Sequence, residues 1–154
     1  ENIEISPKIY PGWTCYIYYS KDADYNIIKK LSKIRYVKLF KMDNSKITPK
    51  LWRYIPVFET KSTVIVRDTD SRLNVRESLA VMEWLSSSKD VHIMRDHEAH
   101  VNKIMAGMFG ARNGVLTHYK EIFYIKSSVG NISNPLTDDE SILSQVFYPK
   151  IIVV

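Results

Sequence analysis

The segment from residue 62 to residue 72 constrains the fold and the chemistry of this 154-residue chain more than any other. It opens with an apolar, β-branched run, Ser62–Arg67, and continues with Asp68 and Asp70, followed by Arg72. Such a run predicts a buried strand. Acidic groups at the carboxyl end of a buried strand indicate a ligand site in an α/β sheet. Two carboxylates one residue apart favour a hard divalent cation, which in turn favours a phosphate-bearing ligand.

Strand-like and helix-like segments alternate along the chain, which predicts an α/β fold with a mainly parallel central sheet flanked by helices. We expect strands at Thr14–Tyr19, Arg35–Phe40, Ser62–Arg67 and Asp90–Arg95, and the start of another at Ile151–Val154. We expect helices at Asp24–Ile34, from Thr48-Pro49 to Phe58, through Val75, Leu79, Met82 and Leu85, and through Ile142, Leu143, Val146 and Phe147. Residues 106–134 have weak periodicity and receive no assignment.

Residues 1–154 are expected to form one domain, because the chain contains no linker, repeat or low-complexity tract. Glu1–Ile9 is typical of the end of a helix, and the last four residues are apolar without a turn signal. We therefore expect a domain that is truncated at both ends and lacks its first strand.

Composition narrows the class of protein. A hydrophobic content of 45% and a charged content of 25% are ordinary for a globular chain and argue against disorder. Cys15 is the only cysteine, which favours a reducing compartment and a cytoplasmic location. Neither a membrane span nor a signal peptide is evident. The net charge of +5 favours anionic ligands, but the basic residues are scattered and no nucleic-acid motif is present, so we expect no nucleic acid partner.

Two Asp-x-Asp triplets occur, and their positions separate them. Asp22 and Asp24 precede an amphipathic helix, where carboxylates cap amide groups, so we interpret them as structural. Asp68 and Asp70 follow a buried strand, so we interpret them as ligand-binding; the alternative is a strand-end ion pair with Arg67 or Arg72.

A second polar cluster follows the fourth predicted strand. Asp96 and His97 are candidates for a general base or, with His100, for a metal site. His92 lies within the strand, and alternation points it away from Asp96, so we interpret it as a packed histidine.

Arg53 lies inside an otherwise apolar helix next to Trp52. A guanidinium there either extends to the surface or contacts an anion. The sequence leaves these alternatives open.

Taken in order, several blocks resemble the GT-A class of nucleotide-sugar glycosyltransferases, in particular the glycogenin and bacterial galactosyltransferase-like group. These blocks are an aromatic-Arg pair (Trp52-Arg53), a strand ending in Asp-x-Asp (residues 64–70), a short strand region (residues 105–110) and a helix start (residues 139–144). Together with Tyr10-Pro11-Gly12-Trp13, Glu83-Trp84-Leu85 and residues 92–97, they also look like an uncharacterised glycosyltransferase-like group of bacteria and large DNA viruses.

The resemblance implies a hexosyltransferase-like enzyme that moves a sugar from a UDP- or GDP-sugar to a hydroxyl acceptor on a glycan, a protein or a small molecule. It implies Mn²⁺ or Mg²⁺ held by Asp70 and Asp68. The donor diphosphate would be bound by cationic groups, for which the candidates are Arg53, Arg67 and Arg72. Asp96 or His97 would serve as the base of an inverting reaction. In a retaining reaction, the group near the donor would be Asp139 or Glu140, where the family has Gln at the second position.

One other enzyme class remains open from the residues themselves. A metal-dependent phosphodiesterase or nuclease would gather carboxylates and imidazoles around one or two ions. Its candidate ligands are Asp68, Asp70, Asp96, His97 and His100.

Overall fold

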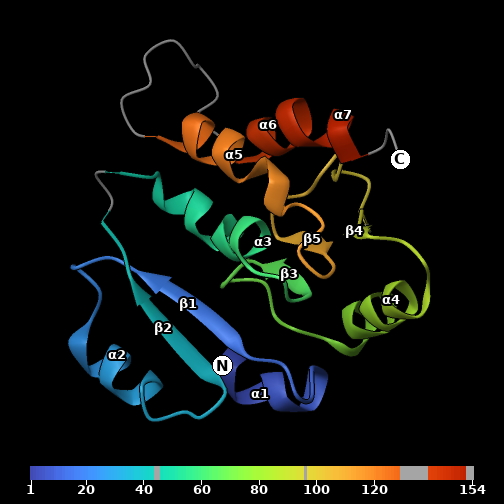
Figure 1. Cartoon of the computed structure of the whole chain (residues 1–154). Helices are drawn as coiled ribbons and strands as arrows, with labels where there is room; N and C mark the ends of the chain where they lie inside the picture. Colours follow the sequence, from blue (N-terminus) through green and yellow to red (C-terminus); the bar gives the residue numbers. More distant parts are fainter. Residues whose placement is uncertain (44–45, 96, 129–138, 152–154) are drawn as a thin grey trace.

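The structure is a computed structural model that describes residues 1–43, 46–95, 97–128 and 139–151 (Figure 1). Its first half contains α1 (Asn2–Ile9), β1 (Cys15–Tyr19), α2 (Tyr25–Leu31), β2 (Val37–Lys41), the 3-10 turn η1 (Pro49–Tyr54), α3 (Ile55–Glu59) and β3 (Val64–Arg67). Its second half contains α4 (Val75–Ser86), β4 (Val91–Ile93), β5 (Met108–Ala111), the 3-10 turn η2 (Thr117–Tyr119), α5 (Lys120–Ser127), α6 (Asp139–Ile142), the π-type turn η3 (Leu143–Phe147) and α7 (Tyr148–Ile151). The chain is thus α/β, as predicted.

The four main strand predictions are confirmed as β1 to β4, and the predicted helices are confirmed as α2, η1 with α3, α4, and α6 with η3. The helix expected at the start of the chain is α1. The unassigned region contains β5, η2 and α5. The prediction of a strand from Ile151 is not met at that residue, which ends α7, and the rest of that segment lies outside the described residues.

The strands form two small sheets, and in the described residues they do not join into a mainly parallel central sheet. β1 and β2 pair in parallel, with Cys15 opposite Val37. The second sheet has the order β3-β5-β4, and β5 runs antiparallel to both neighbours. The prediction of a mainly parallel sheet therefore needs correction for the described part of the chain.

The connection between β4 and β5 explains the antiparallel pairing. A parallel return normally needs a crossover connection, which usually contains a helix. The described residues between Ile93 and Met108 contain no helix, and the chain returns beside β4 in the opposite direction. Because β3 and β4 are both antiparallel to β5, they run in the same direction, and their carboxyl ends lie at the same edge.

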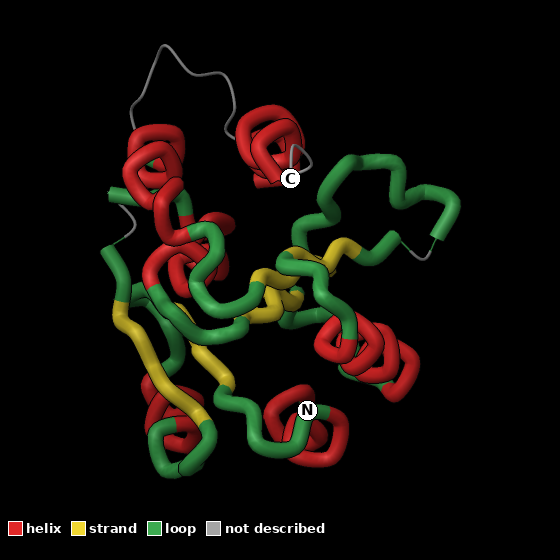
Figure 2. Tube along the Cα trace, turned by 45° about the vertical axis from the view of Figure 1, so that its right-hand side comes forward, coloured by secondary structure: helices red, strands yellow, loops and turns green. Residues whose placement is uncertain are grey.

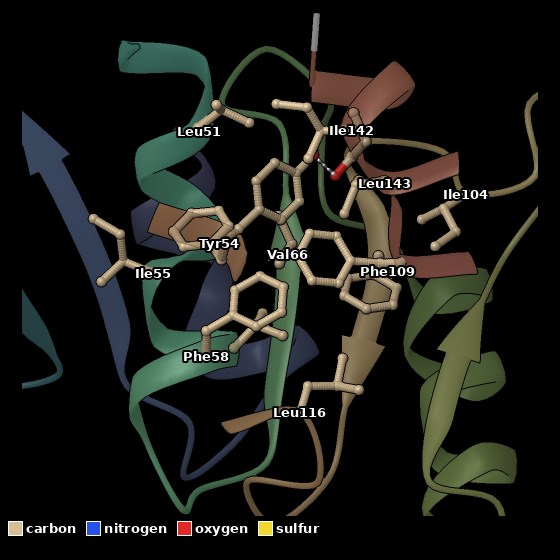
Figure 3. Packing of buried hydrophobic residues seen from close by; sticks show 14 of the residues in the cluster. Leu51, Tyr54, Ile55, Phe58, Val66, Ile104, Phe109, Leu116, Ile142 and Leu143 are labelled. Atoms are coloured by element: carbon tan, nitrogen blue, oxygen red, sulfur yellow. Dashed lines mark hydrogen bonds between the residues drawn. The ribbon is translucent and has the colours of Figure 1, made fainter. Parts of the chain in front are cut away.

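Both faces of the three-stranded sheet are covered, because side chains alternate across each strand. Val66 and Phe109 face the main core, where they join Tyr54 and Phe58 from η1 and α3 (Figure 3). Phe147 from η3 belongs to the same core. On the other face, α4 packs through Val81 and Trp84, and Ile65 contacts that smaller cluster. The views in Figures 1 and 2 place α4 at the periphery of the molecule.

Candidate functional site

A cavity of about 280 Å³ lies beside the carboxyl end of β3. Its walls come from the end of β3, the following loop, the first turn of α4, the segment before β5 and the start of α6. The lining residues are Arg67, Asp68, Ser71, Arg72, Asn74, Glu77, His100, Met105, Ala106, Gly107, Met108 and Glu140. Five of the predicted residues, Arg67, Asp68, Arg72, His100 and Glu140, are therefore brought to one cavity.

Asp68 and Arg53 connect this cavity to two other parts of the chain. The guanidinium of Arg53 forms an ion pair with Asp68 and donates a second hydrogen bond, of 2.9 Å, to Oδ2 of Asp139. A third bond, from Nε to the carbonyl oxygen of Lys50, is 3.1 Å long and orients the guanidinium on η1. Arg53 thus contacts anions, and these anions are carboxylates of the protein itself. The alternative of an ion pair between Asp68 and Arg67 or Arg72 is replaced by this pair with Arg53.

The Arg53 guanidinium remains charged in this setting. Burial lowers the pKa of Arg53, but Tyr54 and the carboxylates of Asp68 and Asp139 raise it by more, so the net shift is upward. Asp139 is almost fully buried at 4% exposure. A buried carboxylate needs a cationic or hydrogen-bonding partner, which explains why Arg53 bridges the two acids.

Gly107 lets the segment before β5 approach Asp68 closely. A Cβ atom at residue 107 would collide with the carboxylate of Asp68, at 2.5 Å from Cγ, and would lie 3.0 Å from the Asp68 backbone nitrogen. The carbonyl oxygen of Gly107 accepts a 2.7 Å hydrogen bond from Arg67. The sequence resemblance covers this glycine but did not identify it as a site residue.

Arg67 and Arg72 supply positive charge to the cavity wall in different ways. Arg67 is mostly buried and forms an ion pair with Glu77, which is itself buried in the first turn of α4. Arg72 is 65% exposed and pairs with the exposed side chain of Glu1. Since exposed ion pairs contribute little, Arg72 can exchange Glu1 for a ligand at small cost.

Glu140 closes the cavity at the start of α6. Its carboxylate accepts hydrogen bonds from the side chain of Asn102 and, at 3.4 Å, from the backbone nitrogen of Ala106. These contacts hold the Glu140 side chain in a defined position between the segment before β5 and α6. Asn102 was not predicted, because a single asparagine in a loop carries no distinguishing sequence signal.

The remaining predicted residues are placed differently. Asp70 is exposed and is not part of the cavity wall, and Asp96 lies outside the described residues. His97 is exposed, and its ring centroid lies 5.6 Å from that of His100. Across residues 1–43, 46–95, 97–128 and 139–151, no three His, Cys, Asp or Glu side chains gather as the ligands of a metal ion would.

Two structural interpretations are confirmed. Asp24 caps α2 by accepting hydrogen bonds from the backbone nitrogens of Asn26 (2.7 Å) and Ile27 (3.1 Å). His92 stacks on Trp84 at a centroid distance of 5.4 Å. Burial, together with the positive charge of Arg67, lowers the pKa of His92, as expected for a packed neutral histidine.

Comparisons with protein families, with curated proteins and with solved structures find no match to this chain. In the part of the chain that the structure describes, no helix is long and apolar enough to cross a membrane. The site must therefore be interpreted from its own residues.

Proposed function

We propose that this chain is a metal-dependent glycosyltransferase that binds the diphosphate of a nucleotide sugar in the cavity beside β3. The observation that supports the proposal is the meeting of residues from four separate sequence blocks. Arg53, Asp68, Gly107 and Asp139 are far apart in the chain, yet they form one connected group, of which Asp68 and Gly107 line the cavity. Each belongs to a block on which the resemblance to GT-A glycosyltransferases rests.

The cationic groups of the wall suit a leaving diphosphate. Negative charge grows on the diphosphate as the bond to the sugar breaks, and positive groups fixed beforehand stabilise that charge. Arg67 is held by Glu77 and by Gly107, whereas Arg72 is exposed and able to turn towards a ligand. Arg53 is absent from the cavity wall, and we infer that it positions Asp68.

The carboxylates of Asp68 and Asp70 suit a divalent cation that is also coordinated by the diphosphate of the ligand. Mg²⁺ is commonly held by one or two carboxylates together with substrate phosphates, so a set of three protein ligands is not required. Asp68 at the wall and the exposed Asp70 would be its protein ligands. When bound, Mn²⁺ or Mg²⁺ would act as a Lewis acid on the diphosphate.

Glu140 and His100 are the wall residues that can act on the sugar or on the acceptor. Glu140 is held by Asn102 and Ala106, which suits a carboxylate that supports positive charge on the donor sugar. Asp96 and His97 remain predictions for the base that activates the acceptor hydroxyl. The proposal includes a cytoplasmic setting, in keeping with Cys15 as the only cysteine, and no nucleic acid partner.

The two Asp-x-Asp triplets provide a matched test. Calorimetry with UDP-glucose and GDP-mannose, with and without Mn²⁺, should detect binding of at least one donor that requires the metal. We expect Asp68→Asn and Asp70→Asn each to weaken that binding by about tenfold or more, since each removes a charged contact. The variant with Asp22→Asn and Asp24→Asn should bind normally, because Asp24 caps α2, Asp22 lies in the turn before it, and neither residue lines the cavity.

Circular dichroism and thermal melting of all four proteins would exclude misfolding as the cause of any loss. Release of nucleoside diphosphate in the presence of a hydroxyl acceptor would then measure transfer. Donor binding that is unaffected by metal and by both substitutions at β3 would contradict the proposal.

A further inference from the structure

α4 carries apolar side chains on two sides. Val81 and Trp84 are 5% exposed and pack against the rest of the molecule with Tyr10. Away from this contact, α4 presents four large apolar side chains to solvent: Val75 (61% exposed), Leu79 (58%), Met82 (60%) and, at the edge of the buried side, Leu85 (38%). We refer to these four residues as the α4 stripe. A surface helix normally turns its apolar stripe towards the core and polar side chains towards solvent, so a second, exposed apolar stripe needs an explanation.

The spacing of the α4 stripe is that of a helix-helix seam. Val75, Leu79 and Met82 are separated by four and three residues, which is the repeat that keeps side chains facing a partner helix in a coiled coil. Exposed apolar residues scattered singly need no explanation, whereas a continuous row on one helix marks an interaction surface. The exposed fractions of these side chains, together with the peripheral position of α4 in Figures 1 and 2, show that the stripe is accessible to another molecule.

The charges beside the α4 stripe indicate what covers it. Arg76 and Glu83 are both exposed and lie seven residues apart, so they occupy the same edge of the stripe two helical turns apart. If two copies of α4 pack antiparallel about a two-fold axis, Arg76 of each copy lies opposite Glu83 of the other. The same register places Leu79 of one copy against Met82 of the other.

A parallel arrangement does not produce this match. There, Arg76 and Glu83 face the other flank of the partner's Val75-Leu79-Met82 row, where Ser78 is buried and Leu85 is apolar. In a two-fold symmetric interface the same surface patch of each copy contacts the other, so the patch must be complementary to itself. The antiparallel arrangement meets this requirement, because each Arg76 lies opposite a Glu83. The charge pattern therefore favours a second copy of this chain, in antiparallel orientation.

We propose that the chain forms a two-fold symmetric homodimer through the α4 stripe. The proposal is independent of the proposed transferase activity. Because one 12-residue helix provides the contact, the interface is smaller than that of a stable protein complex, and we expect a dissociation constant between about 1 μM and 1 mM.

Charge exchange tests the register directly. Sedimentation equilibrium of the whole chain between about 5 μM and 1 mM, the range set by the expected affinity, should show reversible dimerisation. Arg76→Glu and Glu83→Arg should each weaken the dimer about tenfold or more, since each places like charges opposite one another. An equimolar mixture of these two variants should form a heterodimer, because both opposing pairs then have opposite sign.

Substitution within the α4 stripe tests the apolar contact. Leu79→Glu should abolish dimerisation, whereas Ile125→Glu should not, because Ile125 is equally exposed (61%) but lies on α5. Melting curves should confirm that every variant is folded. A monomer throughout the concentration range would overturn the proposal, since the stripe would then be covered by something other than a second copy. A dimer that survives Leu79→Glu, or a mixture of the charge variants that stays monomeric, would overturn it as well.

Discussion

Asp68 is held from two sides by residues that are distant in the sequence. Arg53 neutralises its charge from η1, and the backbone at Gly107 lies directly against its carboxylate. Both contacts limit the rotation of the carboxylate. The position of the Asp68 carboxylate therefore depends on residues that would not themselves react with a ligand. Gly107 is the least replaceable of them, because any side chain there would collide with Asp68.

We expect Gly107→Ala to destabilise the protein by about 1–3 kcal/mol, because the new methyl group overlaps the Asp68 side chain. Urea denaturation should measure this loss. In a background that already carries Asp68→Ala, the same substitution should cost less, since the carboxylate that it displaces is gone. Equal losses in the two backgrounds would mean that the backbone around Gly107, and not the Asp68 side chain, resists the methyl group.

At the scale of elements, α4 was predicted correctly as a helix, but from apolar residues that the structure places on its exposed side. The residues that mark this helix in the sequence are Val75, Leu79, Met82 and Leu85, and all four are exposed. The buried side instead includes Glu77 and Ser78, two polar residues that a sequence pattern assigns to solvent. Glu77 is tolerated there because Arg67 pairs with it, and Ser78 because its hydroxyl donates to the carbonyl oxygen of Val75.

Truncation should therefore destabilise the protein at one of two neighbouring residues of α4 and have little effect at the other. We expect Val81→Ala to lower the free energy of unfolding by roughly 1–3 kcal/mol, because it removes buried methyl groups and leaves a cavity. Met82→Ala should change it by less than about 0.5 kcal/mol, as is usual for exposed positions. Denaturation at low micromolar protein concentration would keep self-association from affecting the comparison. The reverse order of the two losses would contradict the assignment of the buried face.

At the scale of the whole molecule, burial is unevenly distributed. The main core begins at Ile47 and draws on η1, α3, β3, β5, α5, α6 and η3. By contrast, no residue of β1, α2 or β2 is buried, and only Tyr18 and Met42 from that part of the chain pack against the main core. The parallel two-stranded sheet is thus the less protected part of the domain.

We predict that the backbone amides of β1 and β2 exchange hydrogen faster than those of β3 and β5. Local opening costs little free energy where few apolar contacts are lost, whereas opening β3 exposes Val66 and the residues packed on it. Hydrogen–deuterium exchange followed by mass spectrometry of peptides 14–20, 36–42, 63–68 and 107–112 would measure the difference. Equal protection of the two sheets would indicate that they open as one cooperative unit.

Local chemistry in the sequence was sufficient to predict several features. Alternation and β-branching predicted β1 to β4, helical spacing predicted the main helices, and the capping role of Asp24 followed from its position before an amphipathic run. The position of Asp68 after an apolar run predicted a ligand site there, and the structure places Asp68 on the wall of a cavity of about 280 Å³. These features depend on interactions within a few residues of one another, which a single sequence displays.

Tertiary structure alone decided the rest. The antiparallel insertion of β5, the pairing of Arg53 with Asp68 and Asp139, and the buried position of Glu77 each depend on contacts between segments distant in the chain. A sequence shows that Arg53 and Glu77 are charged, but not which opposite charge the fold brings to them. A buried charge is tolerated only where a partner offsets its desolvation. The buried face of α4 and the composition of the cavity wall were therefore determined only by the packing of the whole chain.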